Sequence, residues 1–185
     1  MLGNKKPTWQ VLISMAEKQQ RYEALVHTFH GELYRFAYWL CRDPNIAEDL
    51  VQETFLRAWR ALDSLHDQHA AKPWLLTILR RENARRFERK QFDYADVEHD
   101  HLVDERSVTL DAEMEQTVVQ RQIAKLSEEY REPLLLQVVM GCSGDEIAEI
   151  LSLNKNTVMT RLYRARNQLK EALSNDDDQL RGASK

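Results

Sequence analysis

A basic segment near the C-terminus carries the side chains whose chemistry is easiest to interpret. Between Lys155 and Lys170 there are five basic residues and no acidic one. Amide, hydroxyl and guanidinium groups in such a segment can contact base edges and phosphates of DNA. The predicted contact residues are Lys155, Asn156, Thr157, Thr160, Arg161, Arg164, Arg166 and Lys170. These residue types indicate binding rather than catalysis.

A helix, a turn and a second helix are predicted to position these side chains. Ser143 can cap the first helix, and Glu146 three residues later would complete a capping box. Residues 152–154 interrupt the apolar pattern with residue types that favour turns. The second helix has one apolar stripe, formed by Val158, Leu162, Ala165 and Leu169. The pattern matches a helix-turn-helix that inserts its second helix into the DNA major groove, and an ordinary helical hairpin with a solvated basic face is the alternative.

Length and composition limit the class of protein. The chain has 185 residues, of which 30% are charged, with only 5 glycines and 4 prolines, which suits a helix-rich protein. It shows no signal peptide and no apolar run long enough to cross a membrane, so we expect a soluble, cytoplasmic protein without direct membrane insertion. The two cysteines, Cys41 and Cys142, are expected to be reduced thiols rather than a disulfide or metal ligands.

Charge is distributed unevenly along the chain, although the net charge is only −4. Residues 71–90 contain seven basic and two acidic residues, whereas residues 91–116 contain nine acidic residues and one basic residue. An acidic segment therefore separates two basic ones. For binding to nucleic acid, this distribution matters more than the sum.

The hydrophobic periodicity predicts an all-α chain with two small helical domains. In the first domain, a short amphipathic helix after Pro7 is followed by helices over residues 22–41, 46–62 and 73–90. Helices of this length joined by short loops make a compact bundle. The predicted boundaries are residues 1–90 for the bundle, 91–109 for a flexible acidic linker, 110–174 for the helix-turn-helix domain and 175–185 for a polar tail.

The second domain is predicted to contain two helices before the helix-turn-helix. The first spans about residues 110–126, and Ser127 marks the start of the next, with Pro133 in or just before its first turn. The core side chains of that helix are predicted to be Leu134, Leu135, Leu136, Val138 and Val139.

Two regions of the first domain could bind partners. The helix over residues 47–59 leaves Glu48, Asp49, Gln52, Glu53 and Arg57 outside its apolar face. This face is either solvated or, since Leu56 and Trp59 lie beyond the buried stripe, a protein-docking surface. The polar loop over residues 63–72 and the arginine-rich helix after it could hold a phosphate backbone and receive unstacked bases. The alternative is an arginine-rich helix that pairs with the acidic linker.

Several motifs occur in an order that resembles the extracytoplasmic function group of bacterial sigma factors. They read AEDLVQETFLRAWRALDS, then PWLLTILRRENARR, then LSEEYREPLLLQVVMGCSGDEIAEIL and NTVMTRLYRARNQLKEAL. The resemblance spans roughly residues 22–173. It implies that the first domain is region 2, which binds the β′ coiled coil of core RNA polymerase and opens and reads the minus-10 promoter element. It also implies that the second domain is region 4, which reads the minus-35 element and contacts the β flap.

The resemblance assigns residues to these roles. The docking motif of the family is present at residues 49–53, and the implied polymerase contacts are Asp49, Gln52, Glu53 and Leu56. The base-capturing loop of the family corresponds to residues 64–72, with Leu65, His66 and Leu76 as candidates for its wall. The implied minus-10 contacts are Ser64, Leu65, His66, Lys72, Leu76, Arg80, Arg81, Asn83, Arg85 and Arg86.

Three positions depart from the pattern of the family. Arg81 stands where an asparagine is common, and Leu65 stands where an aromatic residue is frequent, so the base preference at the minus-10 element stays open. Ser152 replaces the usual glycine of the helix-turn-helix, so the turn must form without a residue that enters positive φ easily. The family is usually held inactive by an anti-sigma protein, which we therefore expect as a partner. No cofactor, metal or catalytic residue is expected.

Three other functions were weighed. A stand-alone helix-turn-helix regulator would not need the docking motif or the loop. A metal-dependent enzyme or redox sensor would use the close histidine pairs, but no carboxylate or cysteine set completes a zinc spacing. These pairs are His27/His30, His66/His69 and His99/His101. A helical adaptor without a nucleic-acid role would leave the basic segment at residues 155–170 unexplained.

Overall fold

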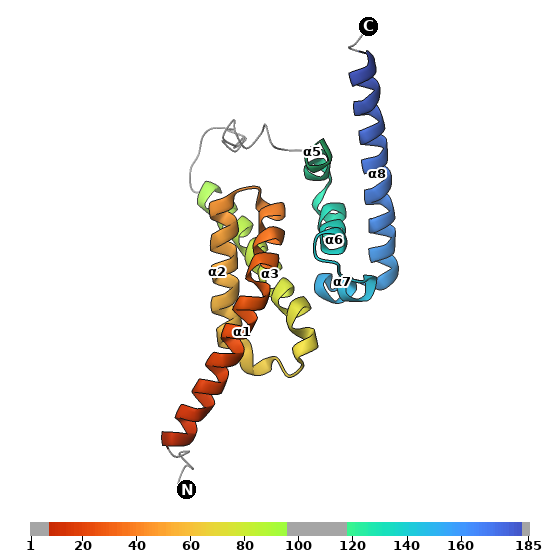
Figure 1. Cartoon of the computed structure of the whole chain (residues 1–185). Helices are drawn as coiled ribbons and strands as arrows, with labels where there is room; N and C mark the ends of the chain where they lie inside the picture. The colour runs from red at the N-terminus through yellow and green to blue at the C-terminus, as the bar shows by residue number, and fades with distance from the viewer. Residues whose placement is uncertain (1–7, 96–117, 183–185) are drawn as a thin grey trace. The chain divides into compact units, whose positions relative to one another are not determined.

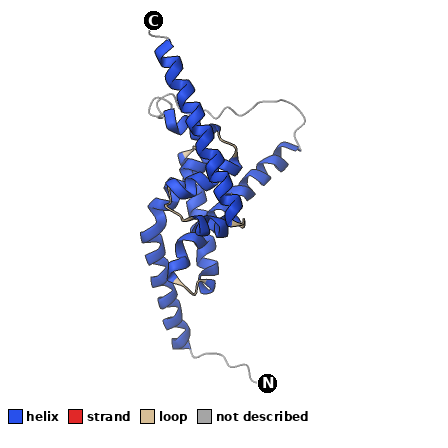
Figure 2. Ribbon diagram, turned by 90° about the vertical axis from the view of Figure 1, so that its right-hand side faces the viewer, coloured by secondary structure: helices blue, strands red, loops and turns tan. Residues whose placement is uncertain are grey.

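The computed structural model describes residues 8–95 and 118–182. Within these ranges the chain is helical, with short connections and no strand, so the all-α prediction is confirmed (Figure 2). The chain divides into two compact units, residues 1–86 and 87–185. Each unit builds its own hydrophobic core.

In the first unit, two helices pack against each other and a third follows them. Helix α1 spans Thr8–Cys41, α2 spans Pro44–Ala61 and α3 spans Ala71–Ala95. Figure 1 shows α1 running beside α2, and this pair forms the largest helix contact of the unit. Two 3-10 turns, Leu62–Ser64 and Gln68–Ala70, lie in the segment between α2 and α3. Side chains buried in the core include Leu33, Phe36, Ala37, Val51, Leu62, Leu75 and Leu79.

The first helix ends at residue 41 as predicted, and α2 begins two residues earlier than predicted. Arg42 takes a positive φ of 58°, and its N–H donates to the carbonyl of Tyr38 at 2.8 Å. This single bond from a left-handed residue is a common way to end a helix. Asp43 then caps α2, because its Oδ1 accepts from the N–H groups of Asn45 and Ile46, and Pro44 occupies the first position, where no N–H is needed.

Three helices are longer than predicted. Helix α1 is continuous, whereas the sequence predicted two helices, because the intervening residues 17–21 are good helix formers. Helix α3 continues to Ala95, five residues into the predicted linker, and α8 continues to Gly182, well into the predicted tail. Charge and polarity marked these segments as loops, but neither contains a proline or an internal glycine that would stop a helix. Residues 96–109 of the predicted linker lie outside the described residues.

The second unit packs three short helices against a long one. Helices α5 and α6 span Val118–Lys125 and Glu128–Val138, and α7 and α8 span Gly144–Leu151 and Lys155–Gly182. Helix α8 contacts each of the other three. The predicted helix over residues 110–126 is described only from Val118 onwards. The fully or almost fully buried side chains include Leu135, Leu136, Ile147, Ile150, Val158 and Leu162.

Helix α6 begins where predicted but differs in two details. The carbonyl of Ser127 accepts from Tyr130 and Arg131, so the helix starts at residue 128 and Pro133 lies inside it, beyond the first turn. Proline has no N–H to donate to the preceding turn, and this position gives up one backbone bond. Val138, predicted to be in the core, is 69% exposed, because the helix ends there and Met140 after it is buried instead.

Candidate nucleic-acid interface

Helix α7 begins and ends with defined hydrogen bonds. The predicted capping box is present: the N–H of Ser143 donates to Glu146 Oε2 at 2.7 Å, and the N–H of Glu146 donates to Ser143 Oγ at 3.3 Å. At the other end, Ser152 is left-handed, with φ 54° and ψ 43°. Its N–H donates to the Glu149 carbonyl at 3.1 Å, and Leu153 N–H donates to the Ala148 carbonyl at 2.9 Å, which is a Schellman motif. The turn therefore forms with a serine in a conformation that usually favours glycine.

The left-handed serine predicts a gain in stability on mutation. Ser152→Gly should raise the free energy of unfolding by about 1 kcal/mol, because glycine has no Cβ penalty at positive φ. For a unit of this size the melting temperature should rise by roughly 4–8 °C in thermal denaturation followed by circular dichroism.

Gly141 provides a matched control for this substitution. It has a φ of 68°, and a Cβ there would meet nothing within 4 Å. Gly141→Ala should therefore destabilise by a similar amount through backbone conformation alone. An unchanged or lower melting temperature for Ser152→Gly would show that the turn relaxes without strain.

Asn154 caps the start of α8. Its Oδ1 accepts from the N–H of Thr157 at 2.8 Å and from the hydroxyl of Thr157 at 2.9 Å. The cap explains why the helix begins at Lys155. It also occupies the hydroxyl proton of Thr157, a predicted base contact, so that this hydroxyl presents only lone pairs to a ligand.

The predicted apolar stripe of α8 is confirmed and leaves the basic side outside. Val158, Leu162 and Ala165 are fully buried, and Leu169 is half-buried. Most predicted contact residues are exposed, with Thr157 and Arg161 half-buried. An open groove of about 680 Å³ lies along this side of the helix. It is lined by Glu129, Tyr130, Asn154, Lys155, Asn156, Thr157, Thr160, Arg161 and Arg164.

The start of α6 holds two arginines of this groove. Arg161 Nη2 lies 3.6 Å from Glu129 Oε2, and Arg164 Nη1 donates to the hydroxyl of Tyr130 at 3.4 Å. That hydrogen bond raises the pKa of Arg164 above its already high ordinary value, so the side chain stays cationic. Glu129 and Tyr130 were not predicted as groove residues, because about thirty residues separate them from their partners in the chain.

Two further basic side chains of α8 also have partners. Lys155 Nζ lies 2.9 Å from Asp145 Oδ2, and Arg166 Nη2 donates to Gln137 Oε1. The first contact is an exposed ion pair, which contributes little to stability and is screened by salt, and the second is an exposed hydrogen bond to a neutral amide. Both cations can therefore exchange their present partner for a phosphate at low cost.

The predicted docking residues lie on one face of α2. Three of them follow Asp49 by three, four and seven residues, namely Gln52, Glu53 and Leu56, which places all four on the same side of a helix. Asp49 and Gln52 are exposed, and Leu56 is 52% exposed although it is a large apolar residue. Trp59, which was predicted to support a docking surface here, lies differently.

The indole of Trp59 is half-buried against α1 and does not extend the docking face. The aromatic ring of Tyr22 meets it edge-on at 5.1 Å, and Lys18 Nζ lies 5.3 Å from its centroid. Trp59 therefore helps to join α2 to α1. The exposed polar face with Leu56 at its end is what remains for a partner.

The loop after α2 is held by α1. Lys18 Nζ lies 2.7 Å from Asp63 Oδ2, and Arg21 Nη2 donates to the carbonyl of Leu65 at 2.8 Å. Ser64 and His66 are exposed. Lys72 at the start of α3 is half-buried, and its Nζ lies 2.7 Å from Glu32 Oε2.

Three predicted minus-10 contacts lie in the core. Leu76 is fully buried, Leu65 packs with Leu62 and Ala71, and Asn83 is only 6% exposed. In the unbound chain these three side chains expose little or no surface, and their assignment as minus-10 contacts stays a prediction. Leucine at the first two positions secures the loop and α3 to the bundle, because burial of such side chains is favourable.

The basic side of α3 carries the remaining predicted contacts. Arg81 and Arg85 are exposed, whereas Arg80 and Arg86 are half-buried. Arg85 Nη1 donates to Oε1 of the buried Glu82 at 2.6 Å. The sequence analysis did not assign Glu82 a role.

Two family models match separate parts of the chain. The model described as Sigma-70 region 2 matches residues 25–92, and the model described as Sigma-70, region 4 matches residues 116–169. The ECF RNA polymerase sigma factor SigC of Mycobacterium tuberculosis (strain CDC 1551 / Oshkosh) is 30% identical over 158 residues, which cover 84% of each chain. The chain belongs to the extracytoplasmic function (ECF) sigma factors.

Further comparisons agree with this ECF sigma factor assignment. The ECF RNA polymerase sigma factor SigW of Bacillus subtilis (strain 168) is 28% identical and covers 84% of this chain and 90% of its own. The sigma factor RpoE of Bartonella quintana, solved in complex with the anti-sigma factor NepR, has a TM-score of 0.65 and 28% identity, covering 84% of this chain and 96% of its own. This ECF sigma factor is therefore an alternative sigma factor that directs promoter-specific transcription initiation.

Two properties of the described part of this ECF sigma factor bear on the alternative functions. Among residues 8–95 and 118–182, no helix is long and apolar enough to cross a membrane. In the same described ranges, no group of three or more histidine, cysteine or acidic side chains gathers as a metal site would require. The pair His99/His101 lies outside these residues.

Proposed function

We propose that the groove along α8 reads the minus-35 element of promoters. The observation that carries this proposal is the cluster of donors on one exposed side of a helix whose other side is buried. Arg161 and Arg164 offer guanidinium donors, and Thr160 offers a hydroxyl. Such groups read base edges in the major groove, while Lys155, Arg166 and Lys170 at the margins would contact phosphates.

The first unit would work on the minus-10 element. Its loop presents Ser64 and His66 to solvent, and α3 presents Arg81 and Arg85 beside it in the chain. Taking a base out of the stack costs a few kcal/mol, which contacts in a pocket can recover. Since Leu65 and Leu76 are buried, the exposed polar residues of the loop are the better candidates for base contacts.

The exposed face of α2 would dock on core polymerase. Asp49, Gln52 and Glu53 supply acceptors and negative charge, and Leu56 supplies an apolar anchor. The family resemblance places the β′ coiled coil on this face and the β flap on the second unit. An anti-sigma protein is a further proposed partner, supported by the similar sigma factor RpoE, which was solved with the anti-sigma factor NepR. A second similar structure, CnrH, was solved with the cytosolic domain of CnrY.

Transcription in vitro tests the proposed function directly. Core polymerase alone and core polymerase with the full chain would transcribe the same genomic DNA library, and the transcripts would be sequenced. New start sites that share two spaced upstream elements are expected only with the full chain. Start sites that share only one element would leave one unit without its proposed role.

If α3 contacts phosphates, removing one of its arginines should lower the affinity for DNA by the same factor whatever the DNA sequence. Arg81→Ala should weaken binding to promoter and random DNA alike, and the slope of log affinity against log salt should become shallower by about one. Fluorescence anisotropy across a salt series would measure it. Glu88→Ala, an exposed charge change on the same helix, should not weaken binding, and a loss on promoter DNA alone for Arg81→Ala would point to base contact.

A further inference from the structure

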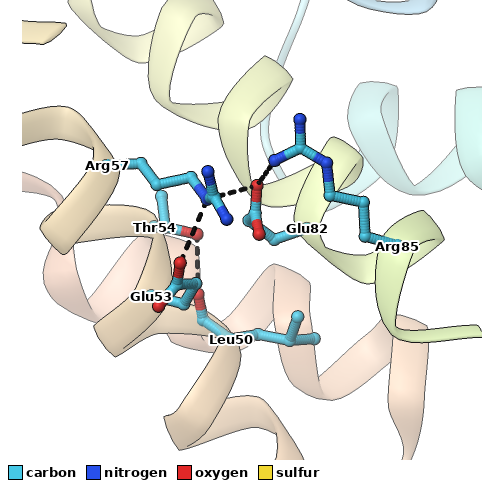
Figure 3. A network of polar contacts seen from close by, with 6 residues as sticks. All are labelled: Leu50, Glu53, Thr54, Arg57, Glu82 and Arg85. Atoms are coloured by element: carbon cyan, nitrogen blue, oxygen red, sulfur yellow. Dashed lines mark hydrogen bonds and ion pairs between the residues drawn. The ribbon is translucent and has the colours of Figure 1, made fainter. Parts of the chain in front are cut away.

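Glu82 is a buried carboxylate with two arginine partners. Its side chain is 6% exposed, and one oxygen, Oε1, contacts both guanidinium groups. Arg85 Nη1 donates to it at 2.6 Å, and Arg57 Nε lies 2.6 Å from it without pointing its N–H at the oxygen (Figure 3). Burying a carboxylate is costly unless it is paired, so Glu82 depends on these cations.

Arg57 shares its charge between two carboxylates. Its Nε also lies 3.0 Å from Oε1 of Glu53, one turn earlier on α2. Glu53 belongs to the proposed docking face, and Arg85 belongs to the proposed phosphate-binding side of α3. A chain of alternating charges, Glu53, Arg57, Glu82 and Arg85, therefore connects the two surfaces (Figure 3).

We propose that this network couples docking at α2 to DNA binding at α3. When a cationic group of a docking partner pairs with Glu53, Arg57 is left to pair with Glu82 only. Glu82 then needs Arg85 less, and the guanidinium of Arg85, which is about half exposed, is released to a DNA phosphate. The coupling is reciprocal, so that DNA bound at Arg85 strengthens docking. The inference rests on the proposed function, because it needs both surfaces to act as assigned.

Removing the charge of Glu53 imitates the docked state without a partner. Glu53→Gln in the full chain should tighten binding to a random-sequence DNA duplex about twofold to fivefold at low salt, measured by fluorescence anisotropy. Asp49→Asn is the matched control, because it removes the same charge from the same face one turn earlier. It should give a much smaller gain, caused only by the change in net charge.

The Arg85→Ala background decides between coupling and general electrostatics. Arg85→Ala alone should weaken binding to the duplex, and Glu53→Gln added to it should bring no further gain. A gain that persists without Arg85, or an equal gain from Asp49→Asn, overturns the inference. The side chains of Glu53 and Arg85 are partly exposed, Asp49 is exposed, and Glu82 keeps Arg57 when Arg85 is removed, so we expect all variants to fold, which circular dichroism would verify.

Failure of the inference is distinguishable from failure of the proposed function. If Arg85→Ala leaves the affinity for the duplex unchanged, Arg85 is not a phosphate contact and the inference is wrong, while the role of α8 in reading promoters still stands. If the wild-type chain neither binds the duplex nor joins core polymerase, the proposed function fails as well.

Discussion

Arg161→Ala is expected to weaken binding to promoter DNA by about tenfold to a hundredfold while leaving the affinity for random DNA nearly unchanged. Arg161 lies inside the groove of α8, half-buried and 3.6 Å from Glu129, where its fork is held in a limited range of orientations. A guanidinium that pairs with a base edge contributes about 1–3 kcal/mol of discrimination, which corresponds to this range. Competition binding with promoter and random duplexes would measure both affinities.

Arg166 is the control for this substitution. It lies on α8 five residues further along, bonds to Gln137 and is not among the residues that line the groove. Arg166→Ala should therefore weaken binding to both duplexes by a similar, smaller factor, as expected for a phosphate contact. Equal losses on promoter and random DNA for Arg161→Ala would remove its proposed role in base readout.

Leu56→Asp is expected to reduce the affinity for core polymerase by roughly thirtyfold or more. An exposed leucine in a docking face loses its water on binding, and truncating such an anchor often costs about 2 kcal/mol or more. Placing a carboxylate there adds a desolvation cost. A fluorescence titration with core polymerase would give the affinity, and transcription from a supercoiled template should fall in parallel.

Met15 offers the matched control on the same unit. It is 57% exposed on α1, away from the helix that carries the docking motif, so Met15→Asp changes the surface in the same way. The affinity of the Met15→Asp variant for core polymerase should equal that of the wild type. Both variants should keep the wild-type melting temperature, because neither side chain is buried. If Leu56→Asp also binds core polymerase normally, the docking surface lies elsewhere.

Local signals explain most of what the sequence predicted correctly. The capping box of Ser143 and Glu146 and the apolar stripe of α8 both depend on residues within one or two helical turns. Periodicity and capping chemistry report such features directly. The helix-turn-helix and the exposed face of α2 could therefore be located from the sequence.

Contacts between residues that are far apart in the chain explain what could not be predicted from the sequence. The burial of Leu76 and Asn83, the pairing of Glu129 with Arg161 and the network around Glu82 all depend on how separate helices meet. Nothing in the local pattern reports such a meeting. The helix ends were wrong for a different reason, since a run of charge lowers hydrophobicity without preventing helical hydrogen bonds.

Contacts with α1 hold the first part of the loop after α2, whereas the next residues of the loop are exposed. Asp63 and Leu65 are fixed by Lys18 and Arg21, and the side chain of Leu65 is in the core. Residues 66–69 are exposed, and among them Asp67 caps the second 3-10 turn, its Oδ1 accepting from the N–H of His69 at 2.9 Å. If this loop receives a promoter base as proposed, exchanging its exposed residues other than Asp67 should change which promoters are opened with little change in the stability of the fold. Promoter preference would then diverge by mutation of a few surface residues, independently of the rest of the protein.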